Sequence, residues 1–484
     1  MTPILLLSLL TTAPLENVVA ADPIAWLEVP ALGRSVGQLE SSQLKPLVAL
    51  LLSRQSRTLL QSANASRLLA AAYGSPTASA DWVVAMEPGS ALGPLRNATR
   101  DWILRQGFTA KAGRAATIDE FARGDESMAL RSADSLLGVA SDPARLRAMA
   151  GVAAKPLGAT DGYRRLSSTP ADLRGAIDVQ RFYGALAVSS FGRTLAGLID
   201  RLGLLETPSA SVTATVDRRK GVRSRLEVQF GPAVPKGLRT VVGPPLVPAR
   251  PAMLPSAAAG YIRVSLHPKR LYELAQILAN YLRPIEASLV RANIDAIEGR
   301  LGKRLGDDIL GDGGQTWTLY FAQGGDEGAP VLLADIADSS AATAFLKEIV
   351  QLLPALAPGV EARLGSTGAA QVYTVTANKR EIVALGVRQG TLIVAAKAAL
   401  VRAALNEKPA VDSPIDEPPA LAYGRLGTAA LRTCLRATLA GRYLLGAANA
   451  RGMNETQVAS ALGAVAFDLA PVDGGWAMNF EMRP

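Results

Sequence analysis

Short segments in which apolar and polar residues alternate recur along the chain, between longer stretches with apolar residues at helical spacing. Residues 211–232 and 463–484 each predict a hairpin whose second strand alternates and ends at a proline. Residues 43–72 and 270–300 are rich in Leu and Ala and predict long helices. Several strands are joined by turns too short for a helical crossover, so these strands pair antiparallel. The pattern predicts an α+β fold in which long helices pack on one face of mostly antiparallel sheets.

Two stretches far apart in the chain match each other. Residues 128–148 and 383–403 align without a gap at an offset of 255, and eight of the 21 positions are identical. Each stretch is expected to form a strand, a tight turn, a second strand and a helix. In the first stretch, Asp142 and Pro143 offer an N-cap and a first-turn proline for that helix.

Weaker matches follow in the same order along the chain. The strand 25–29 (AWLEV) matches 260–264 (GYIRV), and the strand 83–85 matches 332–334. Order-preserving matches of this kind predict an internal duplication. We therefore expect two tandem homologous repeats, residues 22–232 and 253–484, with residues 233–252 as an irregular Pro- and Gly-rich connector between them.

The N-terminus has the pattern of a secretory signal peptide. An apolar stretch at residues 4–10 is followed by a polar segment and then by small residues up to Ala21, just before Asp22. Residues 1–21 are therefore predicted to be a signal peptide that is cleaved after Ala20 or Ala21, which places the mature chain in the periplasm or outside the cell. No Lys or Arg precedes the apolar stretch, so a cytoplasmic location is the alternative. No apolar run approaches the ~18 residues that span a bilayer, and no transmembrane segment is expected in the mature chain.

The chain is basic, with 51 Lys and Arg residues against 42 Asp and Glu residues and a formal net charge of +9. Most basic residues are interleaved with acidic ones at helical spacing, which argues against a nucleic-acid partner. One dense cluster spans a predicted hairpin turn, where it is typical of a charged edge that keeps a sheet soluble. Contact with a polyanion is the alternative for this cluster, which consists of Arg218, Arg219, Lys220, Arg223 and Arg225.

The composition excludes several kinds of chemistry. A single His and a single Cys cannot build a Cys/His zinc site, an iron–sulfur cluster or a disulfide framework within one chain. The sequence also lacks a Walker-type glycine loop, a G-x-G-x-x-G after a strand and an H-E-x-x-H, so we predict neither a cofactor nor a metal. His267 is expected to support a strand-to-helix junction, and Cys434 is expected to be a small buried residue.

Acidic residues suggest one alternative activity. Asp307, Asp308 and Asp312 lie in a Gly-rich segment that lacks the alternating order of a calcium loop, so a helix-to-strand turn is favoured there. Asp335 and Asp338 flank the end of a strand and the start of a helix, where Asp338 or Ser339 is expected to be the N-cap. A carboxylate-dependent hydrolase would require these acids to converge in one pocket.

Three features together resemble an uncharacterised family of bacterial envelope or secreted proteins that is known only as a domain of unknown function. They are the exported N-terminus, the small-residue strands 25–29 and 260–264 after Ala21-Asp22 and Ser256, and a Leu-Gly helix end before an Asp-Ile-Leu turn within 305–319. The resemblance implies no activity and no catalytic residue.

We therefore expect an exported, non-enzymatic envelope protein with a binding or structural role. Duplication without a catalytic constellation favours a protein that holds a hydrophobic ligand or a protein partner between its two repeats. The carboxylate-dependent hydrolase and the polyanion-binding protein are the alternatives.

Overall fold

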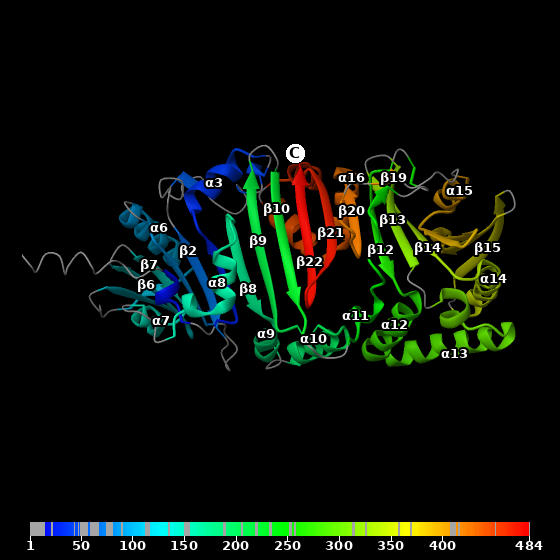
Figure 1. Cartoon of the computed structure of the whole chain (residues 1–484), viewed down its shortest axis with the longest axis horizontal. Helices are drawn as coiled ribbons and strands as arrows, with labels where there is room; N and C mark the ends of the chain where they lie inside the picture. The colour runs from blue at the N-terminus through cyan, green and yellow to red at the C-terminus, as the bar shows by residue number, and fades with distance from the viewer. Residues whose placement is uncertain are drawn as a thin grey trace, which may run out of the picture. The chain divides into compact units, whose positions relative to one another are not determined.

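The computed structural model describes most of the chain between Leu15 and Arg483 (Figure 1). Within that span it leaves out residues 21–22, 43, 47, 49–56, 59–66, 74–80, 89–90, 112–116, 134–135, 150–154, 187–189, 205–206, 218–220, 232–234, 251–253, 256–257, 312–314, 325–326, 357–358, 368–369, 407–412, 415–416 and 451. The chain forms two compact units. The first holds residues 1–196 and 205–231, with Pro484, and the second holds residues 197–204 and 232–483. Both combine helices with antiparallel sheet, which confirms the predicted α+β class.

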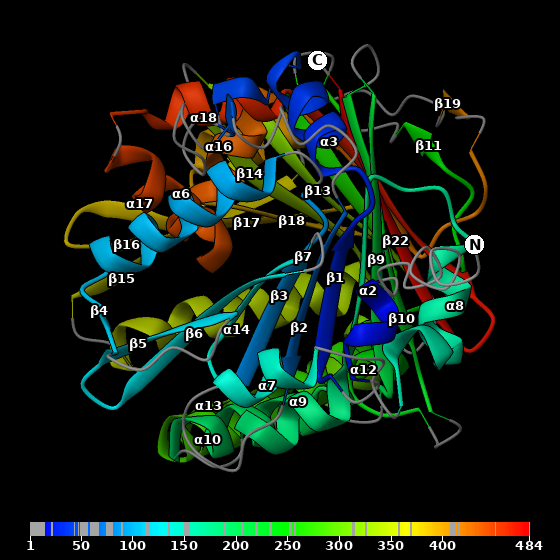
Figure 2. The ribbon, with the colours of Figure 1, turned by 90° about the vertical axis from the view of Figure 1, so that its left-hand side faces the viewer.

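The described strands of the first unit form one antiparallel sheet in the order β4-β5-β6-β7-β3-β2-β1-β8-β9-β10. Figure 2 shows β3, β2 and β1 side by side. The strands are β1 (Ala25–Val29), β2 (Leu68–Tyr73), β3 (Asp81–Met86), β4 (Thr109–Ala110), β5 (Ile118–Arg123), β6 (Glu126–Ala133), β7 (Leu136–Ala140), β8 (Leu173–Asp178), β9 (Ser209–Asp217) and β10 (Gly221–Gln229). Its helices are α2 (Leu15–Val18), α3 (Leu32–Glu40), α6 (Leu92–Arg105), α7 (Pro143–Ala148), the 3₁₀ turn η2 (Leu157–Ala159), α8 (Asp161–Ser167), α9 (Val179–Leu186) and α10 (Ser190–Arg201), which ends in the second unit.

The described strands of the second unit run in the order β15-β16-β17-β18-β14-β13-β12-β20-β21-β22, again all antiparallel. They are β12 (Gly260–Leu266), β13 (Gln315–Gly324), β14 (Glu327–Asp335), β15 (Val360–Thr367), β16 (Ala370–Ala377), β17 (Arg380–Arg388), β18 (Thr391–Ala395), β20 (Ala422–Leu426), β21 (Ala464–Val472) and β22 (Gly475–Arg483). A small separate sheet pairs β11 (Ala249–Arg250) with β19 (Ser413–Pro414). The helices are α11 (Leu238–Val241), α12 (Pro268–Leu282), α13 (Pro284–Leu301), the π-helical turn η3 (Leu305–Leu310), α14 (Ser339–Leu356), α15 (Ala398–Asn406), α16 (Thr428–Ala437), α17 (Leu439–Asn449) and α18 (Glu455–Leu462).

The strand pairing of the two units agrees in register as well as in order. Ala129 pairs with Ala140 in the first unit, and Ala384 pairs with Ala395 at the same offset of 255 in the second. The agreement corrects one of the weaker matches by a single residue. Val331, which lies opposite Ala395, is the counterpart of Val83, whereas the sequence match had assigned Leu332. Because adjacent residues of a strand point to opposite faces, only the corrected pair places two buried valines in the core.

A glycine stands at the same place in both sheets. Gly175 lies opposite Leu27 on β1, and Gly424 lies opposite Ile262 on β12. A Cβ atom at either glycine would come within 2.6 Å of a backbone carbonyl oxygen, that of Trp26 or of Tyr261. Glycine is therefore required by close approach of the backbone at both positions.

Helices cover both faces of each sheet at its β6–β7 or β17–β18 end, not one face as predicted. In the first unit, α6 packs against Leu130 and Leu137, while Leu146 of α7 packs on the opposite face against Ala129. In the second unit, α15 and α14 occupy the two faces. Asp142 caps α7 and Pro143 begins it, as the sequence predicted. The β6 and β17 strands have apolar side chains on both faces, so one helical layer could not bury them.

Two other predicted segments differ in the structure. Residues 233–252 are not an irregular connector, because they include α11 and β11 and belong to the second unit. Val241 is buried there, and the Leu246 N–H donates a 2.7 Å hydrogen bond to the Ala420 carbonyl. The long helix predicted over 43–72 is wrong at its end, where residues 68–72 belong to β2. This strand lies between β1 and β3 in the sheet, and its alternate residues are buried. Much of the preceding stretch lies outside the described residues. In the part of the chain that is described, no helix combines the length and hydrophobicity needed to cross a membrane.

Candidate functional site

A helical hairpin follows β12 in the second unit. α12 begins at Pro268 and ends at Leu282, and α13 begins at Pro284. Proline disfavours helical geometry in the residue before it, and Arg283 accordingly has φ −146° and ψ 71°. α13 ends at Gly302, which adopts a left-handed conformation. The helix predicted over 270–300 is therefore two helices, which are separated at Arg283.

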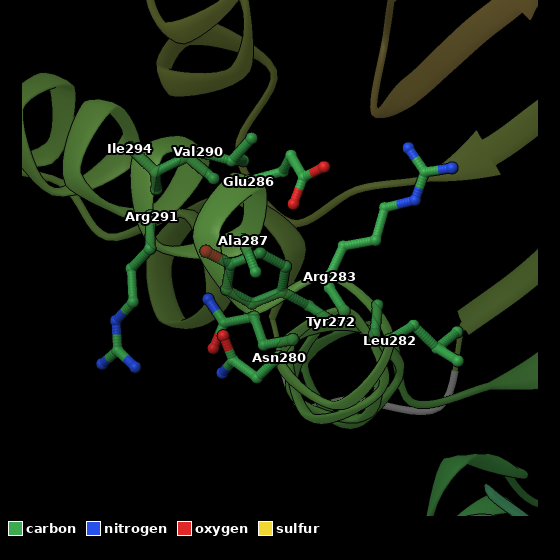
Figure 3. A pocket seen from close by; sticks show the side chains of 12 residues that line it. Tyr272, Asn280, Leu282, Arg283, Glu286, Ala287, Val290, Arg291 and Ile294 are labelled. Atoms are coloured by element: carbon green, nitrogen blue, oxygen red, sulfur yellow. The ribbon is translucent and has the colours of Figure 1, made fainter. Parts of the chain in front are cut away.

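An apolar groove lies between these two helices (Figure 3). Ala275 and Ala279 on α12 and Ala287 on α13 leave room where larger side chains would have closed the interface. The resulting cavity measures about 410 Å³, which is within the range of small-molecule sites. Its wall is completed by Tyr272, Gln276, Asn280, Leu282, Arg283, Glu286, Val290, Arg291 and Ile294.

Three charged side chains are among those that line the groove, Arg283, Glu286 and Arg291. Figure 3 shows the guanidinium groups of Arg283 and Arg291 pointing away from one another. Arg291 lies 4.0 Å from Asp295, whereas Arg283 and Glu286 form no ion pair among the described residues. Burial raises the pKa of the Tyr272 phenol, and the negative charge of Glu298 adds to that effect. An apolar channel with a few polar groups at its edge suits binding of an apolar molecule.

Where the structure describes them, the acidic residues considered for hydrolysis are engaged in local contacts. Asp307 pairs with Lys269 at 2.6 Å, and the hydrogen bond from Lys269 lowers the pKa of that carboxyl. Asp308 accepts a hydrogen bond from the Arg304 backbone. Asp335 accepts one from the Thr316 backbone, and Asp312 lies outside the described residues.

Asp338 caps α14, as predicted. Its carboxylate accepts hydrogen bonds of 2.9 Å from the backbone N–H groups of Ser340 and Ala341. These bonds, led by that from Ala341, lower the pKa of Asp338. A general acid would need a raised pKa, so neither Asp307 nor Asp338 is arranged for that role.

Only two residues of the predicted basic cluster lie among the described residues. Arg218, Arg219 and Lys220 lie outside the described residues. Arg223 and Arg225 are exposed on β10, and Arg225 lies 3.4 Å from Glu227 on the same strand. Within the described part of the cluster, the positive charge of Arg225 is therefore partly offset by Glu227 beside it.

His267 and Cys434 occupy ordinary structural positions. His267 is the N-cap residue of α12, and its backbone N–H donates to the Val241 carbonyl at 2.7 Å. Cys434 is partly buried in α16, and burial raises the pKa of its thiol. Among the described residues, no group of three or more His, Cys, Asp or Glu side chains could hold a metal ion.

A buried ion cluster in the first unit was missed by the sequence analysis. Glu28 on β1 is fully buried and accepts hydrogen bonds from Arg174, Arg67 and Tyr163, with Arg174 Nε 2.7 Å from one carboxylate oxygen. Burial alone would raise the pKa of Glu28, but Arg174 and Arg67 outweigh it and the pKa is lowered. The partners lie 39, 135 and 146 residues away in the chain, so the only local signal was an acid in the middle of an apolar strand.

The end of the predicted signal peptide packs against this cluster. Glu16 on α2 forms an ion pair with Arg67, and Val19 is 1% exposed within the core of the first unit. The Leu157 N–H donates a 2.8 Å hydrogen bond to the Val19 carbonyl. Cleavage after Ala20 or Ala21 would remove all three contacts.

A polar cleft of about 480 Å³ opens beside Arg174. Arg34 pairs there with Asp172 at 3.1 Å, and Asp172 also accepts a hydrogen bond from the Val216 backbone. Arg174 itself is committed to Glu28 and to the Ser167 carbonyl. The charges that line the cleft are thus engaged within the protein.

Fold and groove together define an α+β protein with an apolar groove on a helical hairpin. No protein-family model matches the chain, and no curated protein matches its sequence. Among solved structures, the chain is similar to one described as "Structure of crystal form I of TP0453", with 10% sequence identity over 46% of this chain and 82% of that chain. The TM-score is 0.28, which does not establish a shared fold.

Proposed function

We propose that this chain is a non-enzymatic binding protein of the bacterial envelope and that the groove between α12 and α13 holds a hydrophobic ligand such as an acyl chain. The groove carries this proposal, because its cavity of about 410 Å³ is lined mainly by aliphatic carbon. Such a surface is favourable to bury and costly to leave in water. The ligand would lie within the second unit.

Two further observations support binding over hydrolysis. The carboxylates of Asp307, Asp308, Asp335 and Asp338 are held in an ion pair, in hydrogen bonds to nearby backbone N–H groups or in a helix cap. The groove itself contains one carboxylate, Glu286, and no His or Cys.

Displacement of a fluorescent fatty acid tests the groove. We expect saturable binding by the full chain, and we expect Ala279→Leu together with Ala287→Leu to fill the groove and to weaken binding at least about tenfold. Ala292→Leu is the matched control, because Ala292 is exposed on α13 and is not part of the groove wall. Absence of saturable binding, or equal binding by the filled and control variants, would overturn the proposal.

Duplication and export remain part of the same proposal. The shared strand order and the common register of Ala129 and Ala384 support two homologous repeats. The apolar stretch at residues 4–10 supports export. The packing of Val19 and Glu16 favours a cut upstream of Leu15 over one after Ala20 or Ala21. Cell fractionation followed by N-terminal sequencing distinguishes an exported from a cytoplasmic chain and locates the cut.

A further inference from the structure

Exposed aliphatic side chains are concentrated on the α12–α13 hairpin. Ile285 is 73% exposed, and four more large aliphatic residues between positions 277 and 290 are 50% exposed or more. They are Ile277, Leu282, Leu289 and Val290. Exposed aliphatic side chains gathered on one element of a folded protein favour contact with another apolar phase or molecule.

These side chains lie on more than one side of the hairpin. Leu282 and Val290 belong to the groove wall. Ile285 and Leu289 do not, and at 100° per residue they lie about half a turn away from Ala287, which faces the groove. A ligand in the groove would therefore leave Ile285 and Leu289 in water. A lipid surface covers both sides of the hairpin at once, whereas a ligand in the groove covers one.

The charges on the hairpin fit an anionic lipid surface. The hairpin, residues 268–301, contains five basic and four acidic side chains, and the whole chain has a net charge of +9. Arg283 and Arg291 flank the exposed apolar residues, and long Arg side chains reach headgroups while their stems stay in the apolar layer. The 18 residues of α13 also include Glu286, Asp295 and Glu298, which favours a helix lying in the interface over one that inserts across the bilayer.

We infer that the tip of the α12–α13 hairpin docks on the surface of an anionic phospholipid bilayer, with Leu282, Ile285 and Leu289 in the outer acyl layer. This inference deepens the proposed function and rests on it, because docking brings the open groove against the acyl chains that it would accept. The bilayer is the occupant of the hairpin surface, and a single chain is the occupant of the groove.

Vesicle co-sedimentation of the full-length protein tests the docking. We expect binding to vesicles of phosphatidylglycerol and phosphatidylethanolamine at low salt, and weaker binding to vesicles of phosphatidylcholine alone. Ile285→Ser with Leu289→Ser should weaken binding about 10- to 100-fold. The matched control is Leu364→Ser with Ile382→Ser, which removes two aliphatic residues of similar exposure from β15 and β17 of the same unit.

The two proposals fail in different ways. If only the groove proposal is wrong, vesicle binding persists and the fatty acid is not bound. If docking is wrong, vesicles are not bound at low salt, or the hairpin and control variants bind equally. Sedimentation that shows a dimer of the unaltered chain and a monomer of the hairpin variant, without vesicle binding, would assign the surface to a second copy and overturn the inference.

Discussion

The two sheets carry side chains of opposite charge at a corresponding position, an acid on β1 of the first unit and a base on β12 of the second. Glu28 is the fourth residue of β1 and lies opposite Arg174 on β8, while Arg263 is the fourth residue of β12 and lies opposite Tyr423 on β20. Glu28 is fully buried in an ion cluster. Arg263 is only partly buried and donates to the Tyr423 hydroxyl at 3.3 Å.

The difference shows how sheets with the same strand order hold different helices and strands in the two units. In the first unit, the cluster around Glu28 fastens α2 and α8 to the sheet through Glu16 and Tyr163. In the second unit, the Tyr423 hydroxyl fastens β11 through hydrogen bonds of 2.9 Å with both the N–H and the carbonyl of Ala249. Apolar alternation is common to both sheets, and the polar contacts hold the segments that are particular to each unit.

The largest expected effect is that of Glu28→Gln. The substitution leaves the buried Arg174 without its counter-charge and leaves Arg67 with Glu16 as its remaining carboxylate partner. Loss of one partner of a buried ion pair costs about 3–5 kcal/mol. Hydrogen exchange of β1 and β2 under increasing urea should therefore reveal early unfolding of the first unit, with β12 and β13 little changed. Arg263→Gln is the matched control and should cost about 1 kcal/mol, because Arg263 retains access to water. Equal costs for the two variants would contradict the contrast between the units.

Removal of residues 1–20 should have the next largest effect. It deletes the buried Val19 and the partner that Glu16 provides to Arg67. Burial of one Val side chain and a partly buried ion pair together suggest a loss of about 2–4 kcal/mol. Removal of residues 1–14 is the control, since it keeps every described contact of α2. If both truncated chains unfold at the same urea concentration, residues 15–20 do not stabilise the first unit.

Tyr423→Phe should have a smaller effect, confined to the second unit. It leaves the Ala249 N–H and carbonyl without the hydroxyl and removes the bond from Arg263. Buried groups that lose hydrogen-bond partners cost about 1–3 kcal/mol. Hydrogen exchange should increase at β11 first. Tyr163→Phe provides the comparison in the first unit, where exchange should increase in α8 and leave β11 unchanged.

The sequence was informative where the pattern is local. The strand–turn–strand–helix motif at 128–148 and 383–403 depends on neighbours within about 20 residues, and the observed register matches its alignment. The helix break before Pro284 could also have been predicted from the sequence, because proline restricts the backbone of the residue before it. By contrast, the Ala-rich β2 has helical propensity, and only its place between β1 and β3 makes it a strand. The Glu28 cluster depends on residues 39 to 146 positions apart that the fold brings together, which no local pattern reports.

The smallest expected effect is a difference in acid sensitivity between the units. The pKa of Glu28 is lowered in the folded protein, so its contribution to stability is complete above its ordinary pKa of 4.5 and is lost as the pH falls through the lower, folded value. Over this range the urea midpoint of the first unit should fall further in the unaltered chain than in Glu28→Gln, which has no carboxylate to protonate at that position. Arg263 stays charged throughout, so Arg263→Gln should follow the unaltered chain in its pH dependence. A pH dependence of the first unit that is identical with and without Glu28 would show that its carboxylate is not ion-paired in solution, and the contrast with Arg263 would then be one of burial alone.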